Sequence, residues 1–191
     1  MRTHIVLTAT GADRVGIIHD VTELLFGLNA NVETSRMVSL GGEFALLMLF
    51  SLPSEQLPHL GTVTETLETQ GYTVKTIQKQ QAQAESLPGW LSYQVDVGGA
   101  DHEGILHQIA HQFSRYGINI EALESGTERA PFGGTPLFTL SVHVAVPPSL
   151  PGRAWITALE DVGRRLNIDI KVLPAEKRQR ANIQAGSTEE R

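Results

Sequence analysis

The sequence predicts an α+β protein built from two copies of one βαββαβ unit. Short apolar runs of strand length alternate with segments whose apolar residues recur at helical spacing, which is the first observation. The glycine pairs at residues 41–42 and 133–134 are the second, because paired glycines between apolar runs are typical of hairpin turns. The third is an internal repeat, since "DRVGIIHDV" at residues 13–21 returns as "DHEGILHQI" at residues 101–109.

The repeat can be followed residue by residue. At a constant offset of 88 residues and without a gap, six positions are identical and apolar classes match elsewhere. The glycine pairs are offset by 92 residues instead, so the second hairpin contains four additional residues. Two copies of a split βαβ unit explain this pattern. The identical pairs are Asp13/Asp101, Gly16/Gly104, Ile17/Ile105, His19/His107, Asn31/Asn119 and Glu33/Glu121.

Each copy predicts the same elements in the same order. We expect the first and third strands to lie centrally, with both helices on one face of the sheet. The other face and the two edges stay uncovered, so association with further units is expected. In the first copy we predict strands at residues 4–10, 31–40, 43–52 and 72–78 and helices at 15–29 and 53–71; in the second we predict strands at 90–97, 117–126, 136–146 and 167–173 and helices at 105–116 and 148–166.

The boundaries between the copies follow from composition. The polar segment "KQQAQAESLPG" at residues 79–89 ends in Pro-Gly, which is typical of a linker. We therefore assign residues 1–80 to the first unit, 81–89 to the linker, 90–174 to the second unit and 175–191 to a polar tail.

The composition excludes several classes of protein. With 41% hydrophobic and 19% charged residues, a chain of 191 residues is globular and long enough for two domains. The net charge of −6 argues against a general polyanion binder, so direct nucleic-acid binding is not expected. The absence of cysteine excludes disulfides and thiol catalysis and suits a reducing compartment. No segment reaches the roughly 20 apolar residues of a membrane span, so we expect a cytoplasmic protein.

The repeated motif begins where a strand passes into a helix. Asp13 is predicted to cap the helix, its carboxylate accepting from the free N–H groups of Val15 or Gly16. Gly16 permits the close approach of another backbone or of a small ligand. Helix N-termini bind carboxylates through free N–H groups and the helix dipole, so the junction suits an amino acid. A dinucleotide is disfavoured because the G-x-G-x-x-G spacing is missing.

Structural roles compete with ligand binding at these positions. Helix capping alone is a sufficient explanation for the aspartates, and close packing alone is a sufficient explanation for the glycines. Asn31 and Asn119 stand where a helix-to-strand turn often requires asparagine. His107 and His111 have a spacing that metal sites use, but no third ligand is fixed and a solvated polar face is the default. We predict no metal and no cofactor, and the missing G-x-S-x-G elbow argues against an enzyme.

Both copies resemble ACT domains, small regulatory modules of ferredoxin-like fold that commonly bind amino acids. The second copy, "GILHQIAHQFSRYGINIEALES", has the family's pattern of glycine, apolar helix, Asn-Ile and a following strand. The first, "DRVGIIHDVTELLFGLNANVE", is similar to the form found in tandem-ACT proteins. The resemblance covers about residues 3–174. It implies a ligand site between neighbouring ACT units, formed by the loop after the first strand and by the second strand of the neighbour.

The resemblance also implies the ligand-binding residues. Arg14 could pair with a ligand carboxylate, and the second copy has His102 there, so the two sites need not be equivalent. The asparagines offer amides that accept from an ammonium group and donate to a carboxylate. The implied residues are Asp13, Arg14, Gly16, Ile17, Asn31 and Val32 in the first set and Asp101, His102, Gly104, Ile105, Asn119 and Ile120 in the second.

From this resemblance we expect a regulatory protein that senses a small amino acid, with glycine as a candidate. It would act on transcription through a protein partner, because the sequence contains no recognisable DNA-binding element. We also expect a homodimer. Two alternatives remain open: a ligand-free ACT module that serves only dimerisation or interaction, and an enzyme or metal protein built around the histidines.

Overall fold

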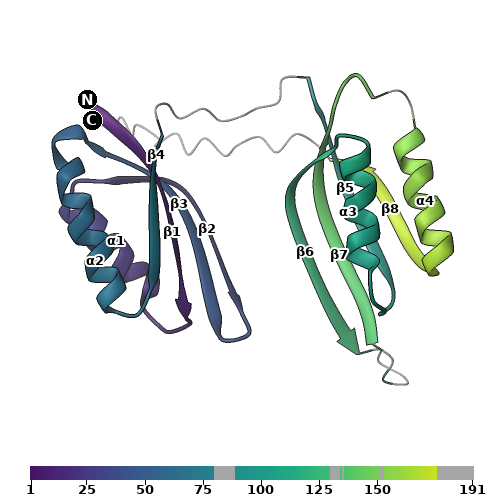
Figure 1. Cartoon of the computed structure of the whole chain (residues 1–191), viewed down its shortest axis with the longest axis horizontal. Coiled ribbons are helices and arrows are strands. Elements are labelled where there is room, and N and C mark those ends of the chain that lie inside the picture. The colour runs from purple at the N-terminus through teal and green to yellow at the C-terminus, as the bar shows by residue number, and fades with distance from the viewer. Residues whose placement is uncertain (80–88, 130–133, 135, 151–152, 176–191) are drawn as a thin grey trace, which may run out of the picture. The chain divides into compact units, whose positions relative to one another are not determined.

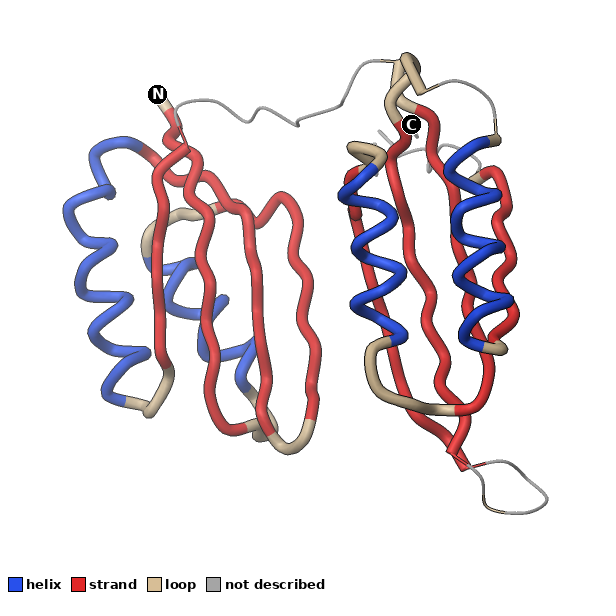
Figure 2. The backbone as a smooth tube through the Cα atoms, turned by 45° about the vertical axis from the view of Figure 1, so that its right-hand side comes forward, coloured by secondary structure: helices blue, strands red, loops and turns tan. Residues whose placement is uncertain are grey.

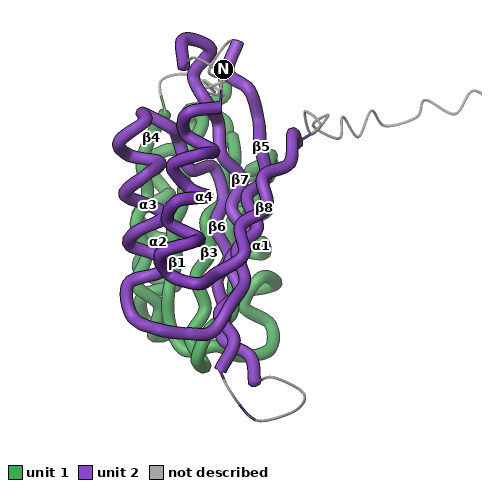
Figure 3. The backbone as a smooth tube through the Cα atoms, turned by 90° about the vertical axis from the view of Figure 1, so that its right-hand side faces the viewer, with its two compact units in different colours: residues 1–85 green, residues 86–191 purple. Residues whose placement is uncertain are grey.

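The chain divides into two compact units, residues 1–85 and residues 86–191 (Figure 3). Apart from Gly89 and Ala175, the predicted linker (81–89) and tail (175–191) lie outside the described residues. The computed structural model describes residues 1–79, 89–129, 134, 136–150 and 153–175.

Each unit contains the predicted elements in the predicted order (Figure 1). The first unit comprises β1 (Arg2–Ala12), α1 (Ile17–Gly27), β2 (Asn31–Leu40), β3 (Glu43–Pro53), a 3₁₀ helix η1 (Ser54–His59), α2 (Leu60–Thr69) and β4 (Thr73–Lys79). The second comprises β5 (Leu91–Ala100), α3 (Ile105–Arg115), β6 (Asn119–Arg129), β7 (Pro136–Val146), α4 (Ala154–Leu166) and β8 (Ile168–Pro174).

The strands of each unit form one antiparallel four-stranded sheet. The strand order is β2-β3-β1-β4 in the first unit and β6-β7-β5-β8 in the second, so the first and third strands are central. Two helices lie against one face of each sheet (Figures 1 and 2). The predicted α+β class with two ferredoxin-like units is confirmed.

The face beneath the helices forms the core of each unit. In β1, Ile5, Leu7 and Ala9 are buried at every second position, as a strand with one covered face requires. The apolar run of β3 follows the same rule, because Phe44 and Leu46 are buried while Leu47 is half exposed. A continuous apolar run in the sequence therefore does not mean that both faces of the strand are buried.

The edge strands β2 and β6 are exposed along their whole length. α2 packs beside β4 and α4 packs beside β8, at the edge of each sheet that lies opposite β2 and β6. As a result, apolar side chains such as Val38 and Leu40 in β2 meet solvent within the isolated unit. Each unit thus keeps an uncovered sheet face and an exposed edge strand that carries some apolar side chains.

The two hairpins differ in length as predicted. Gly41 and Gly42 connect β2 to β3 with φ values of 62° and 85°, the two positive angles of a type I′ turn. In the second unit Arg129 pairs with Pro136, so six residues connect β6 to β7 where two connect β2 to β3. Of these six, only Gly134 lies among the described residues.

Three helices begin later than predicted. α1 begins at Ile17, and Val15, the first residue of the predicted helix at 15–29, is 97% exposed because the chain has not yet entered the helix there. The segment predicted to begin the second helix is the 3₁₀ helix η1, which contains Pro58, a residue without an N–H group. α4 begins at Ala154 and not at residue 148.

Two helical glycines predict opposite effects on stability. A Cβ atom at Gly163 of α4 would lie 2.9 Å from the carbonyl oxygen of Ile168, whereas the space beside Gly61 of α2 is open. We expect Gly163→Ala to lower the free energy of unfolding by about 1–3 kcal/mol through overpacking. Gly61→Ala should raise it by about 0.5–1 kcal/mol through helix propensity. Urea unfolding followed by circular dichroism measures both, and shifts of the same sign would contradict the assignment.

Candidate ligand site

The N-terminus of α1 is open. Gly16 occupies the N-cap position with φ 96° and ψ −1°, and no side chain caps the helix. The first helical hydrogen bond runs from Asp20 N to Gly16 O at 3.0 Å, so the helix leaves the N–H groups of residues 17–19 without an internal partner. α3 begins in the same way at Gly104. Each unit therefore presents three N–H donors at the positive end of a helix dipole.

The aspartates of the motif do not cap the helices, which corrects the capping prediction. The Asp13 N–H donates to Gly42 O at 2.8 Å, and the Asp13 carboxylate accepts a hydrogen bond from Ser39 Oγ. Asp101 makes the equivalent contact, accepting from Thr127 Oγ1 at 3.3 Å. Each aspartate ties the end of the first strand to the hairpin between the second and third strands. The helix N-terminus remains uncapped as a result.

The glycines of the motif serve backbone conformation and not close packing. A Cβ atom at Gly16 would meet nothing nearer than Arg14 Nη1 at 3.7 Å, and one at Gly104 would meet nothing within 4 Å. Their φ values of 96° and 88° lie in the left-handed region, where an L side chain is strained. Glycine is required here for its φ angle, and the space beside it is open to a small molecule.

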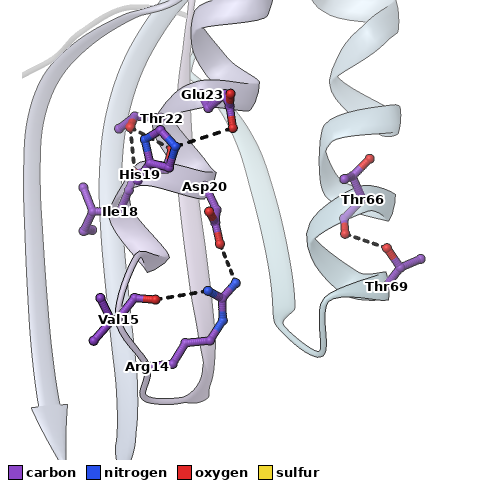
Figure 4. A network of polar contacts seen from close by, with 9 residues as sticks. All are labelled: Arg14, Val15, Ile18, His19, Asp20, Thr22, Glu23, Thr66 and Thr69. Carbon is purple, nitrogen blue, oxygen red and sulfur yellow. Dashed lines mark hydrogen bonds and ion pairs between the residues drawn. The ribbon is translucent and has the colours of Figure 1, made fainter.

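Arg14 lies beside this helix N-terminus (Figure 4). Its guanidinium group forms an ion pair with Asp20 and donates from Nη1 to Val15 O at 3.2 Å. The hydrogen bond to the Asp20 carboxylate raises the pKa of Arg14 above its ordinary value, so the guanidinium group stays charged. Five N–H donors leave capacity for a further acceptor. Arg14 can thus bind a carboxylate without leaving Asp20.

Tyr72 completes the site, and sequence reasoning did not identify it. Its ring lies under the guanidinium group of Arg14, with 5.4 Å from Cζ to the ring centroid, and packs edge-on against Phe44. The residue is 5% exposed, and its hydroxyl makes no hydrogen bond of standard geometry with the described residues, although its proximity also helps to raise the pKa of Arg14. The contact depends on the pairing of β4 with β1, which no local pattern reveals. A buried hydroxyl without a partner is costly unless a ligand or water satisfies it.

The loop of the second unit has a different chemistry. His102 replaces Arg14, and its Nε2 lies 3.1 Å from the carbonyl oxygen of Leu166 at the end of α4. Ile168 stands in the place of Tyr72, packed so tightly that a Cβ atom at Gly99 would lie 2.7 Å from its Cγ2. The second junction therefore shares the open helix N-terminus but lacks the arginine and the buried hydroxyl.

Asn31 and Val32 lie far from the loop of their own unit. Asn31 pairs with Ser51 of β3, level with His4 of β1, whereas the loop follows Ala12 at the other end of that strand. Eight strand residues separate the two levels, which corresponds to about 25 Å. Asn119 and Ile120 occupy the same position in β6. One unit alone does not bring its loop residues and its second-strand residues together. A site that contains both kinds of residue therefore requires a second unit.

The backbone corrects one further interpretation of the sequence. The left-handed turn residues between helix and strand are Asn29 (φ 53°) and Gly117 (φ 63°), so Asn31 and Asn119 are strand residues and not turn residues. As whole residues, Ile17 is 2% exposed and Ile105 is 1% exposed, so both isoleucines belong to the core. Of the three uncapped N–H groups in each unit, the two that follow the isoleucine belong to exposed residues.

The histidines form no metal cluster in the described part of the chain. His107 and His111 stack with their ring centroids 6.3 Å apart, but no group of three or more histidine, cysteine, aspartate or glutamate residues there is arranged to hold a metal ion. None of the helices in the described ranges is long and apolar enough to cross a membrane.

Comparison with known proteins identifies the first unit. Residues 3–78 match the family model of the ACT domain. The glycine cleavage system transcriptional repressors of Escherichia coli (strain K12) and Shigella flexneri are each 30% identical to the chain over 134 residues. The match covers 66% of this chain and 66% of each repressor, so the chain aligns with about two thirds of their length.

Solved structures extend the similarity to both units. A crystal structure of an unknown protein from Galdieria sulphuraria has a TM-score of 0.80 and 32% identity, covering 92% of this chain and 100% of the other. A crystal structure provisionally assigned as a glycine cleavage system transcriptional repressor has a TM-score of 0.66 and 20% identity, covering 92% and 99%. These matches show a shared two-unit fold.

The buried hydroxyl leads to a prediction for Tyr72→Phe. Removing an oxygen that has no partner in the unliganded protein should raise the free energy of unfolding by up to about 1 kcal/mol, because its desolvation is uncompensated. Urea unfolding measures the change. Tyr93→Phe is a matched control in the second unit, where the ring packs against Trp155. A loss of stability in Tyr72→Phe that exceeds the control would mean that the hydroxyl already has a partner.

Proposed function

Because this chain belongs to the ACT-domain family, we propose that it is a regulatory protein that senses glycine or another small amino acid. The observation that carries the proposal is the open N-terminus of α1 beside Arg14 and the buried Tyr72 hydroxyl. Free N–H groups and an arginine held over a tyrosine ring form a set of donors suited to a carboxylate. The glycine cleavage system named in the repressor relatives supports glycine as the ligand.

The ligand carboxylate accepts from the N–H groups of residues 17–19 and from Arg14. Its ammonium group needs acceptors, and the amide oxygen of Asn31 or Asn119 from a neighbouring ACT unit can supply one. Asp13 and Gly16 then act indirectly, the first by holding the loop to the hairpin and the second by its left-handed conformation. In the second unit the loop of Asp101, His102 and Gly104 binds more weakly, since it lacks the arginine.

Transcription is the process that the regulator affects, and it does so through a protein partner. The repressor relatives support the role in transcription. The net charge of −6 supports a protein partner over direct binding to nucleic acid. Ligand binding favours one arrangement of ACT units, which changes their affinity for the partner. We place this regulation in the cytoplasm.

A ligand-free role in assembly is the second candidate, and the uncovered sheets favour it. β2 and β6 are exposed throughout, with Val38 and Leu40 among the exposed apolar side chains. Such an edge is stabilised by pairing with another strand. We propose that two copies of the chain associate through these sheets, and a sensor and a pure assembly module share this feature. The two candidate functions differ only in whether the chain binds an amino acid.

Calorimetric titration of the full chain with a panel of amino acids tests the sensing function. We expect glycine or another small amino acid to bind with a millimolar or lower Kd. Arg14→Gln should weaken binding about tenfold, as expected for loss of one charged hydrogen bond to a carboxylate. Lys75→Gln, which removes a charge from β4 of the same unit, should leave binding unchanged.

The same titrations separate the two candidate functions. If no amino acid binds at millimolar concentration, the sensing proposal is wrong and the assembly module remains. In that case Gly16→Ala and Asn119→Ala should alter stability or assembly equally with and without amino acids. If the chain is a sensor, Asn119→Ala should weaken ligand binding.

Sedimentation of a charged variant tests the association of copies. Val38→Glu places a carboxylate on the exposed edge strand β2 and should shift the chain towards the monomer mass, because burying an unpaired charge opposes association. Phe26→Glu changes a side chain on α1 that is also highly exposed and should leave the mass unchanged. A monomeric wild-type chain at micromolar concentration would contradict the association.

A further inference from the structure

A basic groove lies on the outer surface of the second unit, between α3 and α4. Its volume is about 480 Å³, and arginines from both helices line it: Arg115 from α3, and Arg164 and Arg165 from α4. The remaining lining residues are Gln112, Ala158 and Asp161. This groove is remote from the N-terminus of α3, because Gln112 and Arg115 belong to the last turns of that helix.

The charges in the groove are only partly balanced. Arg164 forms an ion pair with Asp161 one helical turn before it. Within the described part of the chain, Arg115 and Arg165 have no acidic partner, and the guanidinium group of Arg115 stacks over the ring of Tyr116. Three arginines and one aspartate give the groove a positive local charge in a chain whose net charge is −6. The groove is therefore suited to an anionic group.

Gln112 adds a polar group to the lining of the groove. The residue is 7% exposed, and it comes from the same helix as Arg115. An amide N–H that lines the groove can donate to a carboxylate that enters it. Gln112 thus adds an uncharged donor to the arginines.

The first unit supplies an internal comparison. Its groove between α1 and the segment of η1 and α2 is lined by residues such as Leu24, Gly27 and Val63 and contains no arginine. By the repeat offset of 88 residues, Leu24 and Gly27 correspond to Gln112 and Arg115. The fold of the unit therefore requires neither the amide nor the arginine at these positions. Their presence in the second unit calls for a different explanation.

We propose that this groove docks an acidic peptide segment of a protein partner. The proposal deepens the proposed function, on which it rests, by naming the surface and the partner chemistry. Arginine matches a carboxylate with two parallel hydrogen bonds, and arginines on facing helices can hold successive acidic side chains. A nucleic acid is disfavoured because a long polyanion would also meet the repulsion of the negative chain.

Fluorescence anisotropy with the full chain tests the docking. The probe is a fluorescein-labelled peptide of six glutamates, and labelled dT12 and inorganic phosphate are the comparison ligands. We expect the peptide to bind with a micromolar Kd that weakens with salt. The double variant Arg115→Gln/Arg165→Gln should weaken binding about tenfold or more, as expected from two exposed charge pairs. Arg36→Gln/Lys75→Gln removes the same charge from the first unit and should leave binding unchanged.

A second variant distinguishes binding in the groove from non-specific attraction between the charges of the chain and the peptide. Gln112→Leu installs the residue that the first unit carries at this position and changes no charge. It should weaken peptide binding while urea unfolding shows a fold as stable as wild type. Equal losses in the two double variants, or no peptide binding at millimolar concentration, would overturn the proposal. Tighter binding of dT12 than of the peptide, or full competition by millimolar phosphate, would also overturn it.

The amino-acid titration distinguishes failure of the docking proposal from failure of the proposed sensing function. Arg115→Gln/Arg165→Gln should bind amino acids as wild type does, because both arginines belong to the second unit and Arg14 belongs to the first. Loss of peptide binding with retained amino-acid binding supports the groove alone. Retained peptide binding in a chain that binds no amino acid would remove the sensing function and leave the docking surface.

Discussion

The left-handed glycine between the first strand and the first helix constrains each unit. At Gly16 and Gly104 the chain must turn with positive φ, which fixes where the helix begins and removes the side chain that could cap it. The neighbouring aspartate is then free to bind the hairpin of the sheet. A helix N-terminus without a side-chain cap is the consequence in both units. The ligand chemistry we propose depends on it.

The two units share a backbone and differ in the side chains placed on it. The first carries an arginine over a buried tyrosine beside the helix N-terminus, where the second has His102 and Ile168. The helix groove shows the reverse, because only the groove of the second unit contains arginines. We interpret this divergence as a division of labour, with ligand chemistry in the first unit and partner chemistry in the second. Duplication allows one fold to present both surfaces.

The uncovered face of each sheet connects these roles to assembly. A four-stranded sheet with helices on one side leaves apolar residues of β2 and β6 exposed. In the first unit, Asn31 lies at the opposite end of the sheet from Gly16, so one unit cannot complete the predicted site. In the function that we propose, association with another unit therefore also supplies the second-strand residues of the ligand site.

The sequence by itself determined the elements, their order and the repeat, because periodicity and glycine turns are local properties of the chain. It also located the Gly16 loop and the four-residue extension of the second hairpin. Only the tertiary structure decided that Asp13 binds Ser39 and that Tyr72 lies under Arg14. It also separated Asn31 from Gly16 by the length of a strand. These contacts join residues distant in sequence, and strand pairing, which brings them together, depends on the whole sheet.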